Sequence, residues 1–473
     1  MRRRAWLLLL LLEGCSLAPD YQRPTTDAAS VYREAGSWAP FDAAQPEPAW
    51  WTAWHDTELD GLEQRALKSN QNLQASLARL DQGRAQGRMA WSALWPSLSA
   101  TALHTDTQIS SHTSIFPVRQ YPVFQTNQVG LDLNYELDLW GALRNGAHAA
   151  DAQIQASAAD LAALTLSTEA EIALDYEGIR MLDQELADVT EWVTNWDENR
   201  HLTQALVSGQ EAAVPDQAQA DFNWQSARQQ LNELRLQRQQ MEHGLAQLVG
   251  EAPERFHVDP HPDFDLPAPL RPGTGLPSRL LERRPDVVAA EARVRAANAN
   301  VGVAKAAWFP VFSLTGNMGY GNTGYGPLLV APNRLWSFGP SLSVPLLDDG
   351  LTAATQDLAQ AQWRESVALY RQAVLGAWRD VEDQLTALHE LDDEVGAAQA
   401  ASEAAHTNWQ QAQLRYDAGL NNRFEVLLAQ RNAITARNQL LQLRLRDLTS
   451  SVLLIKALGG GWEGLDVMAK DAP

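Results

Sequence analysis

The chain has 473 residues, of which 58 are Asp or Glu and 37 are Lys or Arg, so its formal net charge is −21 at pH 7. This acidity argues against nucleic acid or anionic lipid head groups as ligands of the surface at large. It suits a solvated acidic surface or an acidic channel lining. The single cysteine excludes disulfide bonds within the chain. Beyond the N-terminus no apolar run reaches about 18 residues, so no transmembrane helix is predicted.

The first residues have the layout of a secretory signal peptide. Three arginines precede an apolar run that is too short to span a bilayer and that ends shortly before Cys15. We predict a signal peptide over residues 1–14 and acylation of Cys15, with Ser16 favouring the outer membrane over the inner one. A plain signal peptide with an incidental cysteine is the alternative, because Glu13 is unusual in a lipidation motif. Residues 15–55 are predicted to form a lipidated tether with little core of its own.

The chain repeats its landmarks at offsets of 209 to 214 residues. The landmark pairs are Pro96 and Pro310, Gly141 and Gly350, Gly209 and Gly419, and Gly250 and Gly460. Because the spacing is kept while the intervening residues differ, the pattern indicates a duplicated architecture. The predicted parts are a first copy over residues 56–250, a linker over 251–278, a second copy over 279–462 and a C-terminal tail over 463–473.

Long helices dominate both copies. Asp56 is the predicted N-cap of a first helix whose apolar residues recur at helical spacing until the helix stops near Pro96. The stretch from Trp140 to Gly209 lacks proline and is rich in good helix formers, so it is predicted as a helix on the order of 100 Å long. Gly209 and Gly419 are predicted to reverse the chain at matching places. Helices of this length pack on neighbours as coiled coils.

Between the helices the hydrophobic period changes to two. From Val129 to Leu139, large apolar residues alternate with Gly130, Asp132, Asn134, Glu136 and Asp138. A similar alternation from Trp336 to Leu346, and weaker strands near residues 97–107 and 311–320, give two strands in each copy. In a soluble sandwich the apolar face would meet a core, whereas in a membrane barrel it would meet lipid. In the barrel, the lumen face would carry Asp132, Asn134, Glu136 and Asp138.

Four strands cannot close a barrel in lipid, because the smallest barrels of this kind have eight strands. Open strand edges in lipid leave backbone groups unsatisfied, which costs several kcal/mol for each group. The chain is therefore predicted to oligomerise, and three copies would supply twelve strands. The helices that continue from the strands would form a helical barrel that extends the same channel.

Catalytic and metal-binding patterns are absent from the sequence. The ten histidines show no His-Glu-x-x-His or similar ligand spacing. The segment Gly319–Gly324 fits a dinucleotide-binding pattern by its letters, but Pro327 and a strand follow it where a helix is required. We interpret it as a flexible loop at a strand tip. No enzyme activity, no cofactor and no metal site is predicted.

Three segments of the sequence carry a resemblance to a known protein family. They are Glu282-Arg283-Arg284-Pro285-Asp286 through Ala296-Ala297-Asn298-Ala299-Asn300 to Trp308-Phe309-Pro310, the N-terminal Cys15-Ser16-Leu17-Ala18-Pro19-Asp20-Tyr21, and the C-terminal Lys456-Ala457-Leu458-Gly459-Gly460-Gly461-Trp462. Together they make the chain similar to the outer-membrane efflux protein family of the TolC and OprM type, in its lipoprotein (NodT) branch. The resemblance extends over essentially the whole chain.

The resemblance implies a mainly α fold with membrane β structure, built from a duplicated helix–strand–strand–helix repeat. It implies a homotrimer in which a twelve-stranded outer-membrane β-barrel is continuous with a twelve-helix periplasmic α-barrel. Family members are exit ducts that dock to a periplasmic adaptor and an inner-membrane pump, here predicted to be of the RND type. They have no cofactor and perform no chemistry.

The resemblance also implies a gate at the periplasmic tip. Phe424 matches an apolar constriction residue of OprM-like proteins, Glu425 a ring aspartate of TolC, and Arg431 an arginine of the OprM type, whereas Leu428 replaces an aspartate. We predict a threefold constriction of Phe424 and Glu425, which would attract cations. The alternative is that Glu425 is a solvated residue on the helix surface. Counting from the paired glycines, Phe424 and Glu425 correspond to Val214 and Pro215, so the gate would belong to the second copy alone.

The turns at Gly209 and Gly419 are predicted to be adaptor-docking tips, although glycine also terminates helices without any partner. A periplasmic adaptor lipoprotein is a rival interpretation, but adaptors carry one helical hairpin and lack two membrane-type strand pairs. A purely structural coiled coil would not need the alternation from Val129 to Leu139. A duct for type I protein secretion remains an alternative, because the sequence does not identify the cargo.

Overall fold

The computed structural model describes residues 16–26, 32–35, 48–108, 123–273, 280–462 and 464. The predicted signal peptide, Cys15 and most of the predicted tail lie outside these residues. The chain divides into two units. The first unit comprises residues 1–25, 79–157 and 290–371, and the second comprises 26–78, 158–289 and 372–473. Among the described residues no helix is both long and apolar enough to cross a membrane.

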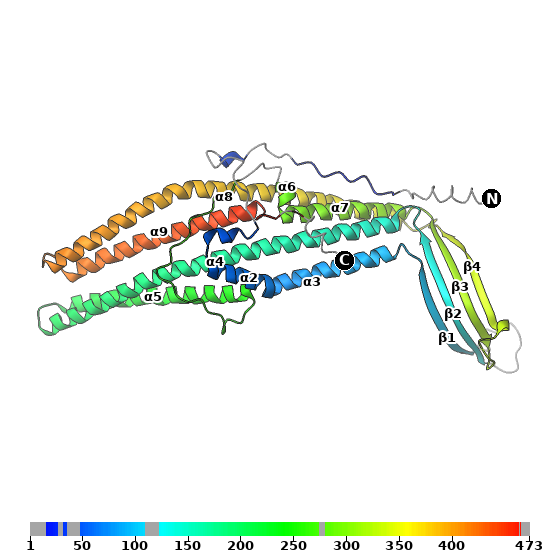
Figure 1. Cartoon of the computed structure of the whole chain (residues 1–473), viewed down its shortest axis with the longest axis horizontal. Coiled ribbons are helices and arrows are strands. Elements are labelled where there is room, and N and C mark those ends of the chain that lie inside the picture. Colours follow the sequence, from blue (N-terminus) through cyan, green and yellow to red (C-terminus); the bar gives the residue numbers. More distant parts are fainter. Residues whose placement is uncertain are drawn as a thin grey trace. The chain divides into compact units, whose positions relative to one another are not determined.

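The strands form one antiparallel sheet in the first unit. They are β1 (Ser97–Gln108), β2 (Val123–Leu137), β3 (Val311–Thr323) and β4 (Arg334–Ser343), and they lie side by side in that order (Figure 1). β2 of the first copy pairs with β3 of the second, with Leu131 opposite Met318. Each copy therefore contributes a hairpin, as the duplicated strand pairs predicted.

The two faces of the sheet differ in chemistry. The register places Leu131, Met318 and Trp336 in one row, and the next row carries Asp132, Asn317 and Ser337. On the apolar face, Met318 is 59% exposed and Trp336 is 74% exposed, so the single chain does not bury this face. The apolar face is therefore not the core of a soluble sandwich.

The helix predicted before the first strand is two helices, α2 (Thr57–Ser69) and α3 (Gln71–Ser92). Asp56 caps α2 as expected, because its carboxylate accepts hydrogen bonds from the Glu58 and Leu59 amides. The break occurs at Asn70, whose side-chain oxygen accepts from the amides of the next helix at Asn72 and Leu73. The second copy has the same division, since α6 (Leu280–Arg283) precedes α7 (Pro285–Ala306).

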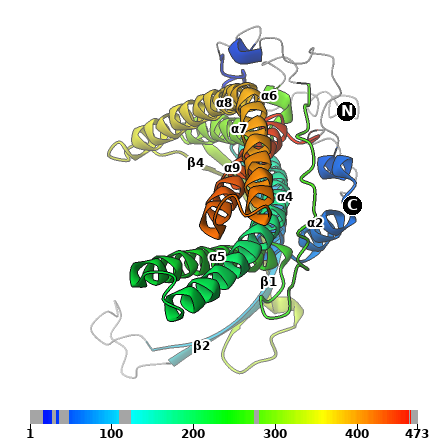
Figure 2. The same ribbon diagram turned by 90° about the vertical axis from the view of Figure 1, so that its left-hand side faces the viewer.

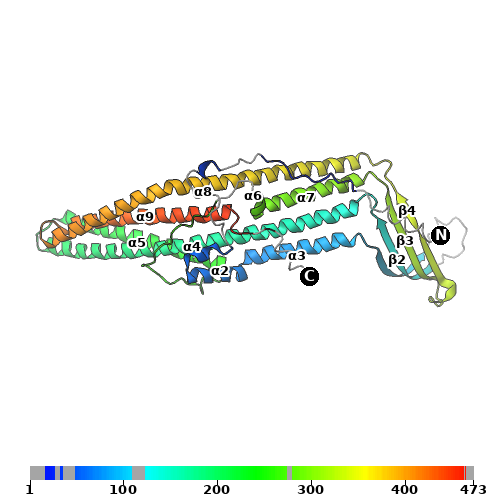
Figure 3. The same cartoon turned by 45° about the horizontal axis from the view of Figure 1, so that its top comes forward.

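The long helices α4 (Ala142–Ser208) and α8 (Leu351–Asp417) each contain 67 residues and start 209 positions apart. Helices α5 (Val214–Val249) and α9 (Arg423–Ala457) follow them, also with starts 209 positions apart. Figure 2 shows α5 beside α4 and α9 beside α8. In the first unit, Figure 3 shows α3, α4, α7 and α8 in that order. The predicted duplication thus holds at the level of whole helices.

In the second unit, each copy contains the same close contact between two helix ends, which we call the joint. Gly250 ends α5 with φ 79°, and a Cβ on it would lie 2.2 Å from the Ser69 carbonyl oxygen at the end of α2. Gly459 repeats this arrangement with φ 97°, where a Cβ would lie 2.4 Å from the Arg283 carbonyl oxygen. Only glycine allows two helix ends to approach so closely in this backbone conformation.

The same joint carries one equivalent hydrogen bond in each copy. The Asn70 side-chain amide donates to the Leu248 carbonyl at 2.7 Å, and the Arg284 guanidinium donates to the Ala457 carbonyl at 3.4 Å. Different side chains therefore satisfy equivalent carbonyl groups near the ends of α5 and α9. The hydrogen bond is therefore duplicated although the donor residues differ, so a comparison of the two sequences does not reveal it.

Parts of the predicted tether and linker belong to the core of the second unit. Trp50 and Trp51 of a short 3-10 helix, η2 (Trp50–Trp54), are buried in one cluster with Tyr176. Phe256 and Val258 of the predicted linker join the same cluster. The expectation of a tether with little core is therefore wrong for Trp50 and Trp51.

Candidate functional site

The polar face of the sheet contains three of the predicted lumen residues. The Asp132 carboxylate accepts hydrogen bonds from the Thr101 hydroxyl at 2.8 Å and from the Asn317 amide at 2.5 Å. These donors come from β1 and β3, so Asp132 bridges three strands. Asn134 and Glu136 follow at alternate positions of β2, so both lie on the same face of the sheet as Asp132.

The fourth predicted lumen residue, Asp138, does not belong to the strand, because β2 ends at Leu137. Its carboxylate accepts hydrogen bonds from the Leu143 amide at 3.1 Å and the Arg144 amide at 2.9 Å, and it pairs with the Arg144 guanidinium. Asp138 therefore satisfies free amide groups in the first turn of α4. The period-two alternation continued past the strand and concealed this role.

The predicted reversals lie at the ends of α4 and α8. In the second copy Gly419 has φ 72°, and the Leu420 amide donates to the Arg415 carbonyl. In the first copy the equivalent left-handed residue is Gln210, with φ 62°, and the Glu211 amide donates to the Leu206 carbonyl. The pairing of Gly209 with Gly419 is therefore wrong by one residue. Gln210, Gly419 and Leu420 are all exposed.

The predicted gate residues form one exposed stripe at the start of α9. Phe424 is 43% exposed, Leu428 is 38% exposed, and both Glu425 and Arg431 are exposed. The intervening residues Val426, Leu427, Ala429 and Gln430 are buried. This spacing puts the four predicted residues on the helix face that the single chain leaves uncovered.

The start of α9 is fixed by contacts that the sequence did not reveal. The Asn422 side chain accepts a hydrogen bond from the Glu425 amide at 3.0 Å, which caps the helix. The Phe424 ring packs edge-on against Trp196 of α4, with 6.0 Å between ring centroids. Arg423 lies 3.5 Å from Glu198 of α4 and 5.6 Å from the Tyr416 ring centroid. In the sequence, the position of Arg423 directly before Phe424 was the signal that could have pointed to these contacts.

The first copy offers a different counterpart to Glu425 from the one predicted. Because α5 and α9 begin 209 positions apart, Phe424 corresponds to Pro215 and Glu425 corresponds to Asp216. The Asp216 carboxylate accepts a hydrogen bond from the Ala213 amide at 3.0 Å. Glu425, by contrast, has no side-chain partner within the described part of the chain.

A buried acidic group lies in the second unit, outside the predicted sites. Glu63 is fully buried, and neither of its carboxylate oxygens has a hydrogen-bond partner among the described residues. Burial raises its pKa to about 10, with further contributions from Glu169 and Asp60. Burial also raises the pKa of Glu169 to about 7. The described part of the chain contains no cluster of three or more His, Cys, Asp or Glu side chains that could hold a metal ion.

Known proteins with a similar sequence are outer-membrane components of efflux systems. A sequence model for the family described as outer membrane efflux protein matches residues 62–251 and 276–460. The toluene efflux pump outer membrane protein TtgC of Pseudomonas putida is 31% identical over 470 residues. The match covers 96% of this chain and 94% of the TtgC chain. Outer membrane protein OprJ of Pseudomonas aeruginosa is 32% identical over 464 residues. The match covers 97% of this chain and 95% of the OprJ chain.

Solved structures give the same result for the fold. The outer-membrane channel OprN is 30% identical and superposes with a TM-score of 0.84, covering 95% of this chain and all of its own. The CmeC outer membrane channel of Campylobacter jejuni superposes with a TM-score of 0.86 over 97% of both chains. At 24% identity, the CmeC comparison bears on the fold alone.

Proposed function

The chain belongs to the outer membrane efflux protein family, and from that premise we propose that three copies assemble into the exit duct of a tripartite pump. The duct would receive small molecules from a periplasmic adaptor and an inner-membrane pump of the RND type, and would conduct them passively to the exterior. It would need no cofactor and would catalyse no reaction. The repeats over residues 56–250 and 279–462 would each supply one strand pair and one long hairpin.

The two-faced sheet is the observation that carries this proposal. Its apolar face is exposed in the single chain, and β1 and β4 each lack a second neighbour among the described strands. Pairing β4 of one subunit with β1 of the next satisfies both edges and gives twelve strands from three chains. The polar face with Asp132, Asn134 and Glu136 would then line water.

The N-terminus supplies the second membrane attachment. Acylation of Cys15 would anchor each subunit in the outer membrane beside its own strands. Ser16 follows directly, and its hydroxyl donates to the Asn145 side chain at 3.0 Å, four residues into α4. The segment after the lipid would thus begin close to the level where β2 gives way to the helix.

The periplasmic end would be gated by the exposed stripe of Phe424, Glu425, Leu428 and Arg431. Around a threefold axis, three Phe424 rings would narrow the channel and three Glu425 carboxylates would attract cations. Leu428 would make the constriction less polar. The free Glu425 carboxylate supports this role, because no described side chain of the same subunit engages it.

Single-channel recording in planar bilayers tests the gate. Glu425→Gln should reduce the preference for cations and the block by multivalent cations. The matched control is Asp216→Asn, which removes the equivalent carboxylate of the first copy from its capping bond and should leave both properties unchanged. The gate proposal would be refuted if the two variants had the same cation preference and cation block, or if Glu425→Gln left both properties unchanged.

The turns at Gly209–Gln210 and Gly419–Leu420 would dock the adaptor. Their exposure at the ends of α4 and α8 supports this assignment. Cysteines introduced at Gln210 and Leu420 should form crosslinks to the adaptor in intact cells, whereas a cysteine at exposed Arg88 on α3 should not. Crosslinking at Arg88 but not at the two turns would contradict the docking assignment.

A further inference from the structure

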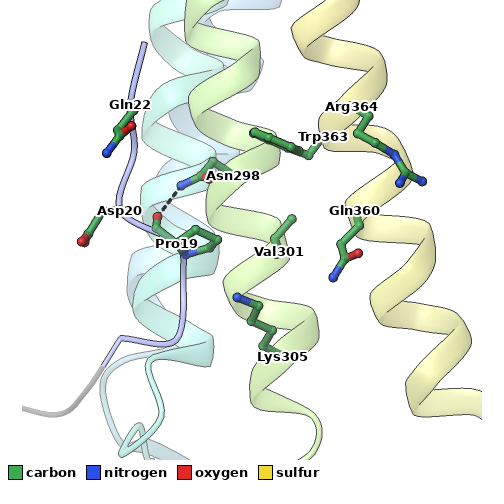
Figure 4. Close-up of a pocket in the computed structure, with 9 residues that line it drawn as sticks. All are labelled: Pro19, Asp20, Gln22, Asn298, Val301, Lys305, Gln360, Trp363 and Arg364. Carbon is green, nitrogen blue, oxygen red and sulfur yellow. Dashed lines mark hydrogen bonds between the residues drawn. The ribbon is translucent and has the colours of Figure 1, made fainter. Parts of the chain in front are cut away.

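A cavity of about 410 Å³ lies in the first unit between the N-terminal segment, α7 and α8. Pro19 and Asp20 form one wall, Val301 and Lys305 of α7 form the floor, and Trp363 and Arg364 belong to α8. In Figure 4 the Trp363 indole reaches from α8 towards α7, and the Lys305 ammonium group points towards the N-terminal segment. The cavity therefore combines an aromatic wall with cationic side chains.

The N-terminal wall is held in a defined position. The Pro19 carbonyl accepts a hydrogen bond from the Asn298 amide at 2.8 Å, as Figure 4 shows. Ala18 packs so closely on α7 that a Cβ on Gly302 would lie 2.6 Å from the Ala18 Cβ. Farther along the segment, Arg23 pairs with Glu291 at 2.6 Å. These contacts hold the N-terminal segment against α7, so the wall of the cavity has a defined position.

Charge gives the cavity a preference for anions. Neither Lys305 nor Arg364 has a hydrogen-bond or ion-pair partner among the described residues, and Asp20 is the only acidic side chain in the lining. This local excess of positive charge contrasts with the net charge of −21 for the whole chain. Two unpaired cationic side chains in the lining, of which Lys305 points towards the N-terminal segment, favour an anion such as a phosphate group.

The sequence position of the cavity brings it to the membrane surface. Lys305 is the penultimate residue of α7, and β3 begins shortly afterwards at Val311. Trp95 precedes β1 and is 74% exposed, and Trp308 precedes β3 and is 53% exposed, as in the aromatic belts at membrane interfaces. The lipid-attachment residue Cys15 lies four positions before Pro19. Lys305 is therefore at the depth of lipid head groups, provided that the strands span the outer membrane as proposed above.

We propose that this cavity binds the phosphodiester head group of a phospholipid from the periplasmic leaflet of the outer membrane. The Lys305 ammonium group holds the phosphate, and Arg364 on α8 adds positive charge nearby. Trp363 and Val301 contact the glycerol and the first methylene groups of the acyl chains. The apolar wall and the position at the membrane favour a lipid over free phosphate. The bound lipid fastens the N-terminal segment and α8 to the same head group.

Native mass spectrometry of the full-length protein in detergent tests the proposal with dioleoylphosphatidylglycerol as the probe. We expect one retained lipid per subunit, and at least a tenfold weaker affinity in the double variant Lys305→Gln, Arg364→Gln. The matched control is Arg88→Gln, Arg371→Gln, which removes two exposed arginines of the same unit outside the cavity lining and should keep the wild-type affinity. Equal loss in both double variants would overturn the proposal, because binding would then follow net charge alone.

Two further measurements identify the ligand and protect the test from folding artefacts. Gln360→Trp should fill the cavity and weaken lipid binding while every charge is kept; unchanged binding would exclude the cavity. Inorganic phosphate at equal concentration should not displace the lipid, and displacement would mean that a free anion is the ligand. Because lipid binding is counted per subunit, its failure can be distinguished from failure of the duct proposal. Planar-bilayer conductance of the same preparations reports separately on the channel.

Discussion

The duplicated joint at the end of α5 makes a strong prediction about stability. Gly250 combines φ 79° with a neighbouring carbonyl oxygen of Ser69 only 2.2 Å from the position of a Cβ. Gly419 has a similar φ of 72°, but a Cβ there would meet no atom within 4 Å. Replacing each glycine by alanine therefore separates the cost of the backbone conformation from the cost of the packing.

The magnitudes follow from these two contributions. A left-handed backbone costs an alanine about 1–2 kcal/mol, and this applies to both variants. Relieving the contact at Gly250 requires Ser69 and Asn70 to move away from α5, which breaks the buried hydrogen bond from Asn70 to the Leu248 carbonyl. Losing a buried hydrogen bond costs about 1–3 kcal/mol. Gly250→Ala should therefore destabilise the protein by about 2–5 kcal/mol, against about 1–2 kcal/mol for Gly419→Ala.

Thermal unfolding in detergent, followed by circular dichroism at the helix band, measures the difference. An unfolding entropy of about 2.1 cal/mol/K for each residue gives the second unit, which is larger than 250 residues, a shift of roughly 1–2 °C for each kcal/mol, so Gly250→Ala should melt roughly 1–6 °C below Gly419→Ala. Gly459→Ala should resemble Gly250→Ala, because its Cβ would lie 2.4 Å from the Arg283 carbonyl oxygen. Equal melting temperatures for Gly250→Ala and Gly419→Ala would refute the packing argument.

Three further predictions concern the sheet, the buried carboxyl and the N-terminal segment. Gly319→Ala should lower the amount of folded protein in outer-membrane fractions, because its Cβ would lie 2.2 Å from a carbonyl oxygen of β2, whereas Gly339→Ala, with open space around it, should not. The raised pKa of Glu63, about 10, means that the contribution of this group to stability is complete below its unfolded pKa and is lost progressively as pH rises from the unfolded pKa to the folded pKa. Glu63→Gln should therefore raise the melting temperature more at pH 8 than at pH 5; a constant difference would contradict the burial argument. Glu291→Gln should speed hydrogen exchange of the segment around Arg23, since it removes the charge that Arg23 contacts at 2.6 Å, and unchanged exchange would show that this pair does not hold the segment.

The sequence was sufficient for the architecture because the helices and strands are long. Over a helix the size of α4, composition and the absence of proline outweigh local exceptions, and the period-two pattern of β2 is unambiguous. Single-residue events were harder to predict. Asn70 breaks the first helix, but part of the reason is its bond to a carbonyl almost 180 positions later in the chain. Periodicity carries no information about such contacts.

The predicted sites depended on register, and register was the weaker inference. Matching Gly209 to Gly419 by letter shifted the first copy by one position, because Gln210 adopts the left-handed conformation that usually attracts glycine. The shift aligned Glu425 with Pro215 and hid its true counterpart, Asp216. Asp138 was misassigned for a related reason: a carboxylate after a strand continues the alternation even when it caps the next helix.

The corrected register also shows how the two copies differ at the tip. Helices α5 and α9 both carry a carboxylate at the third helical position, and the amide groups of both first turns need acceptors. In the first copy the N-cap is Ala213, which has no polar side chain, and the Asp216 carboxylate is used locally to accept from the Ala213 amide. In the second copy the Asn422 side chain accepts from the Glu425 amide, and the Glu425 carboxylate has no partner among the described residues. The Asp216 carboxylate is thus engaged locally whereas the Glu425 carboxylate is not, which favours the second copy as the site of the proposed gate even though both copies carry the charge.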